Sequence, residues 1–187
     1  MPTVDQAENL MREGAFSEAK KILSQILNDN PGDLRAVCDI GIAYTETGEN
    51  EKAIKALEHY IRNDDSNPYA WEAIGCARFR IGELEEAKHC LERSLELSPD
   101  NPSSLRNLGI IEGMEGYHEK GLKLLQDALR LAPGDFRTLY ALSYAYRDLN
   151  KREQRRKVID QLLDLELPDD INKDAQLTRI RMNLGWE

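Results

Sequence analysis

The sequence has little of what secreted, membrane-spanning or disulfide-bonded proteins require. Its 187 residues include only three cysteines, Cys38, Cys76 and Cys90, and no two of them form a CxxC pair. An odd number of widely spaced cysteines indicates a reducing compartment rather than a disulfide framework. No apolar run approaches the roughly 18–20 residues of a membrane span, and the opening MPTVDQAENLMREG has no basic or apolar signal segment. We therefore expect a cytoplasmic protein without a membrane span.

Basic charge is also scarce. Lys and Arg number 25 against 34 Asp and Glu, which gives a formal net charge of −9. An acidic chain is poorly suited to a phosphate backbone, so we do not expect nucleic acid as the partner. Hydrophobic residues make up 41% of the sequence, which is enough for a folded core and argues against disorder.

Motifs for catalysis and metal binding are absent. The three histidines, His59, His89 and His118, are far apart, and the sequence contains no HExxH, GxSxG, P-loop or Cys/His metal spacing. We therefore predict that the protein is not an enzyme and has no catalytic residues, no cofactor and no metal site.

What the sequence does contain is a repeat of 34 residues. The residues at one site of this repeat are Gly14, Gly48, Gly82, Gly116 and Asn150. Within each unit, apolar residues recur at i, i+3 and i+4, in two stretches separated by that site, which predicts two antiparallel helices joined by a tight turn. The turn needs a left-handed backbone that costs residues other than glycine about 1–2 kcal/mol, and asparagine is the usual substitute.

Further residues mark the helix starts and a close approach of the two helices. Asp33, Asn67, Asn101 and Asp135 are predicted N-caps, and the two asparagines precede a proline at the first helical position. A second set of glycines falls inside the first helices, where glycine costs about 1 kcal/mol against alanine. These glycines are Gly41, Gly75 and Gly109. We expect the second helix to pack closely there, through the Ala19, Ala53 and Ala87 series.

The pattern resembles the tetratricopeptide repeat, in which W-x2-L-G-x2-Y is followed by A, F and P. The third unit matches it best, through Trp71, Ile74, Gly75, Gly82, Ala87, Leu91 and Pro99. The resemblance implies an all-α fold, a right-handed α-solenoid of antiparallel helix pairs. Five units are expected at residues 1–33, 34–67, 68–101, 102–135 and 136–169, with the first degenerate at its start, and a capping helix at 170–187.

The resemblance also implies a function, that of a non-enzymatic protein–protein interaction scaffold or adaptor. Family members usually bind a peptide on the concave surface, which the first helix of each unit lines. In this sequence the corresponding positions combine apolar residues with arginines, which suits a protein or peptide with acidic and apolar side chains. The candidate binding residues are Arg35, Ile42, Tyr69, Cys76, Phe79, Arg80, Arg106, Asn107, Ile110, Arg137, Tyr140, Tyr144 and Arg147.

Several alternatives stay open at this point. The same residues could simply pack against neighbouring helices. The chain could instead self-associate as a structural scaffold that stacks through its terminal repeats. The basic block KREQRRK at 151–157 could dock an acidic partner or form a solvated helix face. A clamp for chaperone C-termini, which some family members carry, is not expected, because only Asn107 and Arg137 fit it in any register.

Overall fold

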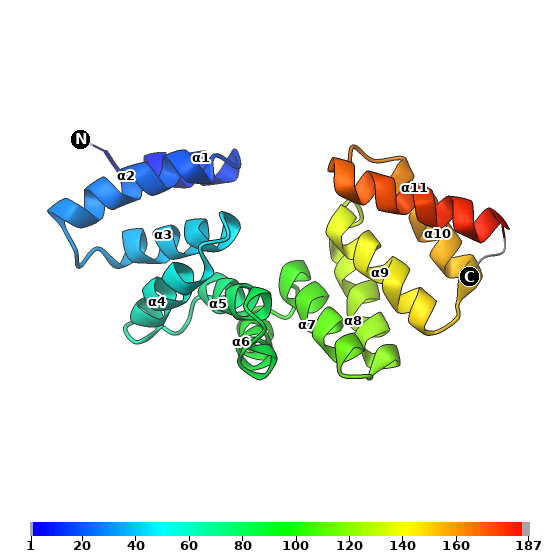
Figure 1. Ribbon diagram of the computed structural model, residues 1–187. Helices are drawn as coiled ribbons and strands as arrows, with labels where there is room; N and C mark the ends of the chain where they lie inside the picture. The colour runs from blue at the N-terminus through cyan, green and yellow to red at the C-terminus, as the bar shows by residue number, and fades with distance from the viewer. Residues whose placement is uncertain (1, 185–187) are drawn as a thin grey trace. The chain divides into compact units, whose positions relative to one another are not determined.

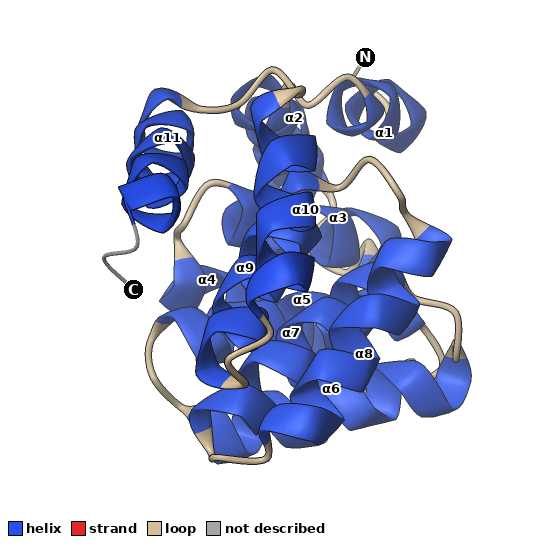
Figure 2. Ribbon diagram, turned by 90° about the vertical axis from the view of Figure 1, so that its right-hand side faces the viewer, coloured by secondary structure: helices blue, strands red, loops and turns tan. Residues whose placement is uncertain are grey.

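The computed structural model describes residues 2–184, and every regular element in that range is an α-helix (Figures 1 and 2). The helices are α1 (Val4–Arg12), α2 (Phe16–Asp29), α3 (Leu34–Glu46), α4 (Asn50–Ile61), α5 (Pro68–Arg80), α6 (Leu84–Leu97), α7 (Pro102–Met114), α8 (His118–Leu131), α9 (Phe136–Asp148), α10 (Arg152–Leu163) and α11 (Asp169–Leu184). None of these helices has the length and apolar character needed to cross a membrane.

The chain forms two compact units, Met1–Pro99 and Asp100–Glu187. We call them unit 1, which contains α1 to α6, and unit 2, which contains α7 to α11. Within each unit successive helices pack as hairpins, such as α3 with α4 and α7 with α8. The first helices of successive hairpins also contact one another: α1 with α3, α3 with α5, and α7 with α9.

The predicted caps begin four of the first helices. The Asp33 carboxylate accepts a hydrogen bond from the Ala36 amide at 3.1 Å, and the Asn67 side chain accepts one from the Tyr69 amide at 3.0 Å. Asn101 and Asp135 cap α7 and α9 in the same way. Each cap satisfies backbone donors that the first helical turn leaves without a partner.

The turn between the two helices of each hairpin has the expected left-handed residue. The φ angles are 77° at Gly14, 78° at Gly48, 86° at Gly82, 90° at Gly116 and 54° at Asn150. Asn150 is the one non-glycine residue with positive φ in residues 2–184. The repeat therefore ends each first helix by the same backbone conformation.

The glycines inside the first helices do mark a close approach. A Cβ on Gly41 would lie 2.5 Å from Leu57 Cγ, and one on Gly75 would lie 2.8 Å from Leu91 Cγ. The alanine series contributes a backbone carbonyl, 3.2 Å away at Ala87. At Gly109 the nearest atom is the carbonyl oxygen of Gly121, 2.9 Å away, at the site that continues the alanine series. The close approach therefore involves a leucine side chain of the second helix together with the backbone of the small-residue series.

The last helix, α11, packs on α10 and buries Ala175, Thr178 and Met182. An ion pair between Arg179 and Asp160, 3.0 Å apart, joins the same two helices. The segment expected to cap the array, 170–187, is helical up to Leu184 as part of α11, and the remainder of it lies outside the described residues.

The basic block opens α10, and several of its side chains have contacts inside unit 2. Arg152 donates a hydrogen bond to the Met182 carbonyl, and Lys151 lies 3.1 Å from a Glu119 oxygen. Arg155 is 8% exposed. Arg152, Arg156 and Lys157 are exposed.

Candidate protein-interaction surfaces

The candidate residues of unit 1 lie on α3 and α5, which contact each other. We define the first-helix face of unit 1 as Arg35, Ile42, Tyr69, Phe79 and Arg80. Tyr69 is 61% exposed, and Arg80, also exposed, donates a hydrogen bond to the Thr45 carbonyl on α3. Ile42 packs against the unit 1 core.

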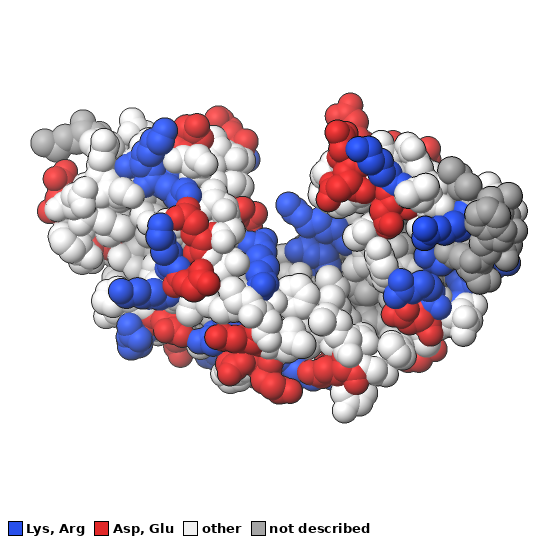
Figure 3. Space-filling view, in the orientation of Figure 1, with Lys and Arg blue, Asp and Glu red and all other residues white. Residues whose placement is uncertain are grey.

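The charge of Arg35 already has partners inside unit 1. Its Nη2 lies 2.9 Å from Asp5 Oδ1 and 2.6 Å from Glu8 Oε1, both on α1. These hydrogen bonds raise the pKa of Arg35 above its usual range. Acidic and basic side chains accordingly alternate over unit 1 in Figure 3. An acidic ligand would have to compete with Asp5 and Glu8 for this arginine.

Asp39, also on α3, is a further group that the predicted site leaves out. Its Oδ2 is buried and has no hydrogen-bond partner among the described residues. Burial and, to a smaller extent, Glu8 raise the pKa of Asp39 to about 6, against the lowering effect of Arg35. The raised pKa of Asp39 could not be predicted from its position in the repeat, because the burial comes from neighbouring helices.

The candidate residues of unit 2 lie on α7 and α9. We define the first-helix face of unit 2 as Arg106, Ile110, Arg137, Tyr140, Tyr144 and Arg147. The hydroxyl oxygens of Tyr140 and Tyr144 lie 3.0 Å apart, and each lies 3.2 Å from Asp174 Oδ2 on α11. Burial, followed by the bond to Tyr144, raises the pKa of Tyr140. The two tyrosines therefore already bind a carboxylate of the chain itself.

The three arginines of unit 2 differ in their surroundings. Arg106 is half-buried and lies 2.9 Å from Asp135 Oδ2. Arg147 lies 4.7 Å from the Tyr144 ring centroid and 2.8 Å from Asp148 Oδ1. Arg137 is exposed and takes part in no ion pair within residues 2–184. Arg137 is thus the arginine of this face that is open to an outside carboxylate.

Arg106 and Asp135 belong to the local structure of α9. Burial alone would raise the pKa of Asp135, but the Thr138 hydroxyl and Arg106 outweigh it and lower the pKa. Asp135 is also the N-cap of α9. Arg106 therefore does not lie on a solvent-facing surface, since its side chain is 13% exposed and pairs with the N-cap residue of α9.

Two candidate residues are turned away from solvent. Cys76 and Asn107 are each 8% exposed. Ile110 is half-buried and packs against the unit 2 core. At these positions, packing against neighbouring helices accounts for the side chain.

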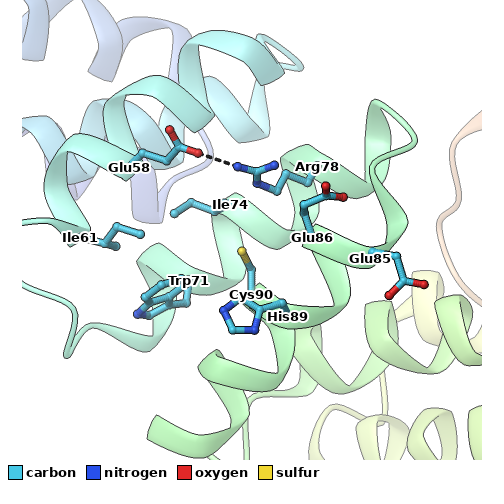
Figure 4. A pocket seen from close by; sticks show the side chains of 9 residues that line it. All are labelled: Glu58, Ile61, Trp71, Ile74, Arg78, Glu85, Glu86, His89 and Cys90. Atoms are coloured by element: carbon cyan, nitrogen blue, oxygen red, sulfur yellow. Dashed lines mark hydrogen bonds and ion pairs between the residues drawn. The ribbon is translucent and has the colours of Figure 1, made fainter.

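Unit 1 also has a pocket that the sequence did not predict. It has a volume of about 480 Å³ and lies among α4, α5 and α6 (Figure 4). Its lining residues are Glu58, Ile61, Trp71, Ile74, Arg78, Glu85, Glu86, His89 and Cys90. We call it the outer pocket, because second helices form two of its sides. Its lining comes from three helices, so no spacing within one helix could have predicted it.

The cysteine in this pocket is not set up as a nucleophile. Burial raises the pKa of the Cys90 thiol to about 11, and that of Cys38 to about 12. A thiol with a raised pKa stays protonated at neutral pH and reacts slowly. Within the described residues, no three His, Cys, Asp or Glu side chains are placed to share a metal ion.

Comparison with known proteins identifies the family. Profiles of the tetratricopeptide repeat match residues 10–75, 68–101 and 136–168, which together exceed half of the chain. The chain is a tetratricopeptide repeat protein. A search of curated proteins gave no sequence match.

Solved tetratricopeptide repeat structures share the fold. MamA is 22% identical with a TM-score of 0.66, over 84% of this chain and 92% of that one. TTC0263, a thermophilic TPR protein in Thermus thermophilus, is 18% identical with a TM-score of 0.72, over 97% of each chain. YrrB, described as a TPR protein with an unusual peptide-binding site, is 17% identical with a TM-score of 0.64, over 92% of this chain and 89% of that one. These likenesses show an all-α tetratricopeptide repeat solenoid, as the sequence predicts.

Proposed function

We propose that this protein is a non-enzymatic adaptor that binds a partner segment with acidic and apolar side chains on its first-helix faces. Membership of the tetratricopeptide repeat family supports the coarser statement, a protein-interaction scaffold. The division of the chain into five repeats of 34 residues and a capping helix is part of the same proposal. The three buried cysteines, none of them in a CxxC pair, fit a cytoplasmic location, which we also propose.

The observation that carries the proposal is the exposure of Tyr69 on α5, next to α3 and on the same helix as Arg80. An aromatic ring that is 61% exposed offers a ligand a large apolar contact area. Tyrosine and arginine are among the residues most enriched at energetically important interface positions.

The acidic preference rests on the arginines that are least neutralised inside the chain. Within the described residues Arg80 takes part in no ion pair, and it donates a hydrogen bond only to the Thr45 backbone carbonyl. Arg137 in unit 2 is likewise outside every ion pair of the described range. A guanidinium has five N–H donors in a fixed fork that matches a carboxylate. Arg80 and Arg137 therefore replace Arg35 and Arg106 as the residues that we expect to contact a ligand carboxylate.

Binding to an array of immobilised peptides tests the proposal. Peptides that combine glutamate with leucine should bind, and Tyr69→Ala combined with Arg80→Glu should reduce their binding to unit 1. Glu92→Lys is the matched control, because Glu92 is exposed on the second helix α6. Equal losses in both variants, or no loss in the double variant, would contradict binding on the first-helix face.

A second candidate function is self-association through the terminal helix. Leu177 on α11 is 52% exposed, although α11 buries its opposite side on α10. Light scattering across a concentration series distinguishes this candidate from the first. An increase in mass with concentration that Leu177→Lys removes would favour stacking through the end of the array. A mass that stays constant would favour the adaptor function instead.

A further inference from the structure

We propose that the outer pocket of unit 1 binds a basic and apolar segment of a partner protein, in which a lysine or arginine side chain enters the pocket beside an aliphatic one. This site differs from the first-helix faces in position and in charge. The proposal rests on the pocket's shape, its apolar walls and its acidic rim (Figure 4).

The walls of the pocket are apolar and fixed in place. Ile61 comes from α4, and Trp71 and Ile74 come from α5. The Trp71 Nε1 donates a hydrogen bond to the Asp65 carbonyl at 2.8 Å. The His89 ring meets the indole edge to face, with centroids 6.4 Å apart and planes at 86°. A fixed indole face offers a cation–π contact of the kind that lysine and arginine make, and Ile61 offers a contact for an aliphatic stem.

The rim carries excess negative charge. Arg78 is neutralised by Glu58 on one side and by Glu83 on the other, each at 2.6 Å. Glu85 and Glu86 are exposed, and neither takes part in an ion pair within the part of the chain that the structure describes. A cationic side chain would therefore meet two unpaired carboxylates, whereas an acidic one would be repelled.

The volume suits side chains of a peptide rather than a whole folded domain. At about 480 Å³ the pocket is within the range of about 300–1,000 Å³ that is typical of ligand sites. The long stem of lysine or arginine can lie along Trp71 while its charged end stays at the rim with Glu85 and Glu86. An adjoining leucine or isoleucine can then contact Ile61. Basic and apolar side chains in one segment satisfy both parts of the pocket.

Tryptophan fluorescence provides the test. The sequence has two tryptophans, Trp71 and Trp186, so Trp186→Phe leaves Trp71 as the single reporter. The probes are a synthetic peptide of lysine and leucine and its counterpart with glutamate in place of lysine. In this background we expect the lysine peptide to change Trp71 emission and the glutamate peptide to have no effect.

Charge reversal makes the test specific. Glu85→Lys with Glu86→Lys should weaken binding of the lysine peptide by about tenfold or more, and should allow the glutamate peptide to bind. Glu92→Lys, on the same helix but outside the lining, should weaken binding clearly less than the double variant does. Melting curves of each variant establish that the fold is kept. Equal effects of Glu92→Lys and the double variant would overturn the proposal.

The chain's own basic block is the competing occupant. A peptide with the sequence of residues 151–157 should bind more weakly than the lysine–leucine peptide, because KREQRRK has no apolar side chain for the walls. If it binds better and the free protein grows in mass with concentration, the occupant is a second copy and the proposal of a different partner is wrong. If charge reversal at Glu85 and Glu86 does not change peptide binding, the outer pocket is ruled out as the site. Binding to the first-helix face is tested separately, by the variant at Tyr69 and Arg80.

Discussion

Asp39 makes the stability of unit 1 depend on pH in a defined direction. Burial and Glu8 raise its pKa to about 6, with Arg35 opposing and Asp33 adding to the rise. A carboxyl group whose pKa is raised on folding contributes stability below its unfolded pKa, about 3.9, and this contribution is lost as the pH rises through the folded pKa. The unpartnered Oδ2 is the structural cause, because ionisation places charge on a buried atom.

We therefore expect Asp39→Asn to stabilise the protein near pH 7 and to have little effect near pH 4. At about 1.4 kcal/mol per pKa unit, the rise to about 6 would correspond to about 3 kcal/mol, and solvent screening of this partly exposed group reduces the expected gain to about 1 kcal/mol. Urea unfolding at several pH values between these limits measures the difference. A gain that is the same at every pH would mean that Asp39 ionisation does not differ between the folded and unfolded states.

The turn glycines give a second prediction for single residues. At Gly82, where φ is 86°, a Cβ would meet no atom within 4 Å, so any cost of a side chain comes from the backbone. Gly82→Val should destabilise the protein by about 1–2 kcal/mol. Asn150→Gly should be neutral or mildly stabilising, because its φ of 54° already suits glycine. Thermal melting checks both changes, with Gly134→Val as a control at a glycine without positive φ.

At the scale of the helix, the pair of Arg106 and Asp135 is structural. Asp135 caps α9, and its carboxylate lies 2.9 Å from Arg106 on α7. Asp135→Ala should cost about 1–3 kcal/mol, from the lost cap and from a half-buried arginine left without its partner. Arg106→Ala should cost less, because the cap survives. A double-mutant cycle in urea should give a coupling energy of at least about 0.5 kcal/mol between them, and additive losses would argue against the pair.

Sequence reasoning worked best where one residue type has one local role. The turn at Asn150 and the caps at Asp33 and Asn67 follow from backbone conformation, which the 34-residue spacing reveals. It was less successful with side chains that have a choice of partners. By its position in the repeat, Arg106 was expected to contact a ligand. In the structure it pairs instead with Asp135 at the start of α9. The outer pocket was missed because its lining comes from three helices, and no spacing within one helix reports such an arrangement.

At the scale of the whole molecule, we expect α11 to protect the end of unit 2. It buries Ala175 and Met182 on α10, and Arg179 pairs with Asp160. Truncation after Pro168 should expose the apolar side of the last hairpin, because terminal helices keep repeat arrays soluble. We expect aggregation in gel filtration with light scattering, or a clearly lower melting temperature. A truncated protein that stays monomeric and equally stable would show that α11 is not a cap.

Net charge gives the last prediction, because it acts on the two proposed sites in opposite senses. The charge of −9 repels an acidic peptide at long range, whereas Arg80 and Arg137 attract it at short range. For a basic peptide at Glu85 and Glu86, the long-range and local fields have the same sign. Salt screens both fields, with a Debye length of about 10 Å at 0.1 M and about 3 Å at 1 M. We therefore expect added salt to weaken binding of both peptides, and the basic one more steeply.

Reversing the charge of the two arginines should invert the salt dependence of binding for the acidic peptide alone. In Arg80→Glu with Arg137→Glu, both fields repel it, so salt should strengthen whatever binding remains. Both arginines take part in no ion pair within residues 2–184, so the reversal should leave the fold intact. Fluorescence anisotropy with labelled peptides at low and high salt measures the slopes. If the acidic peptide still binds more weakly as salt is added to this variant, then charges elsewhere attract it, and the first-helix faces would have to be abandoned as its site.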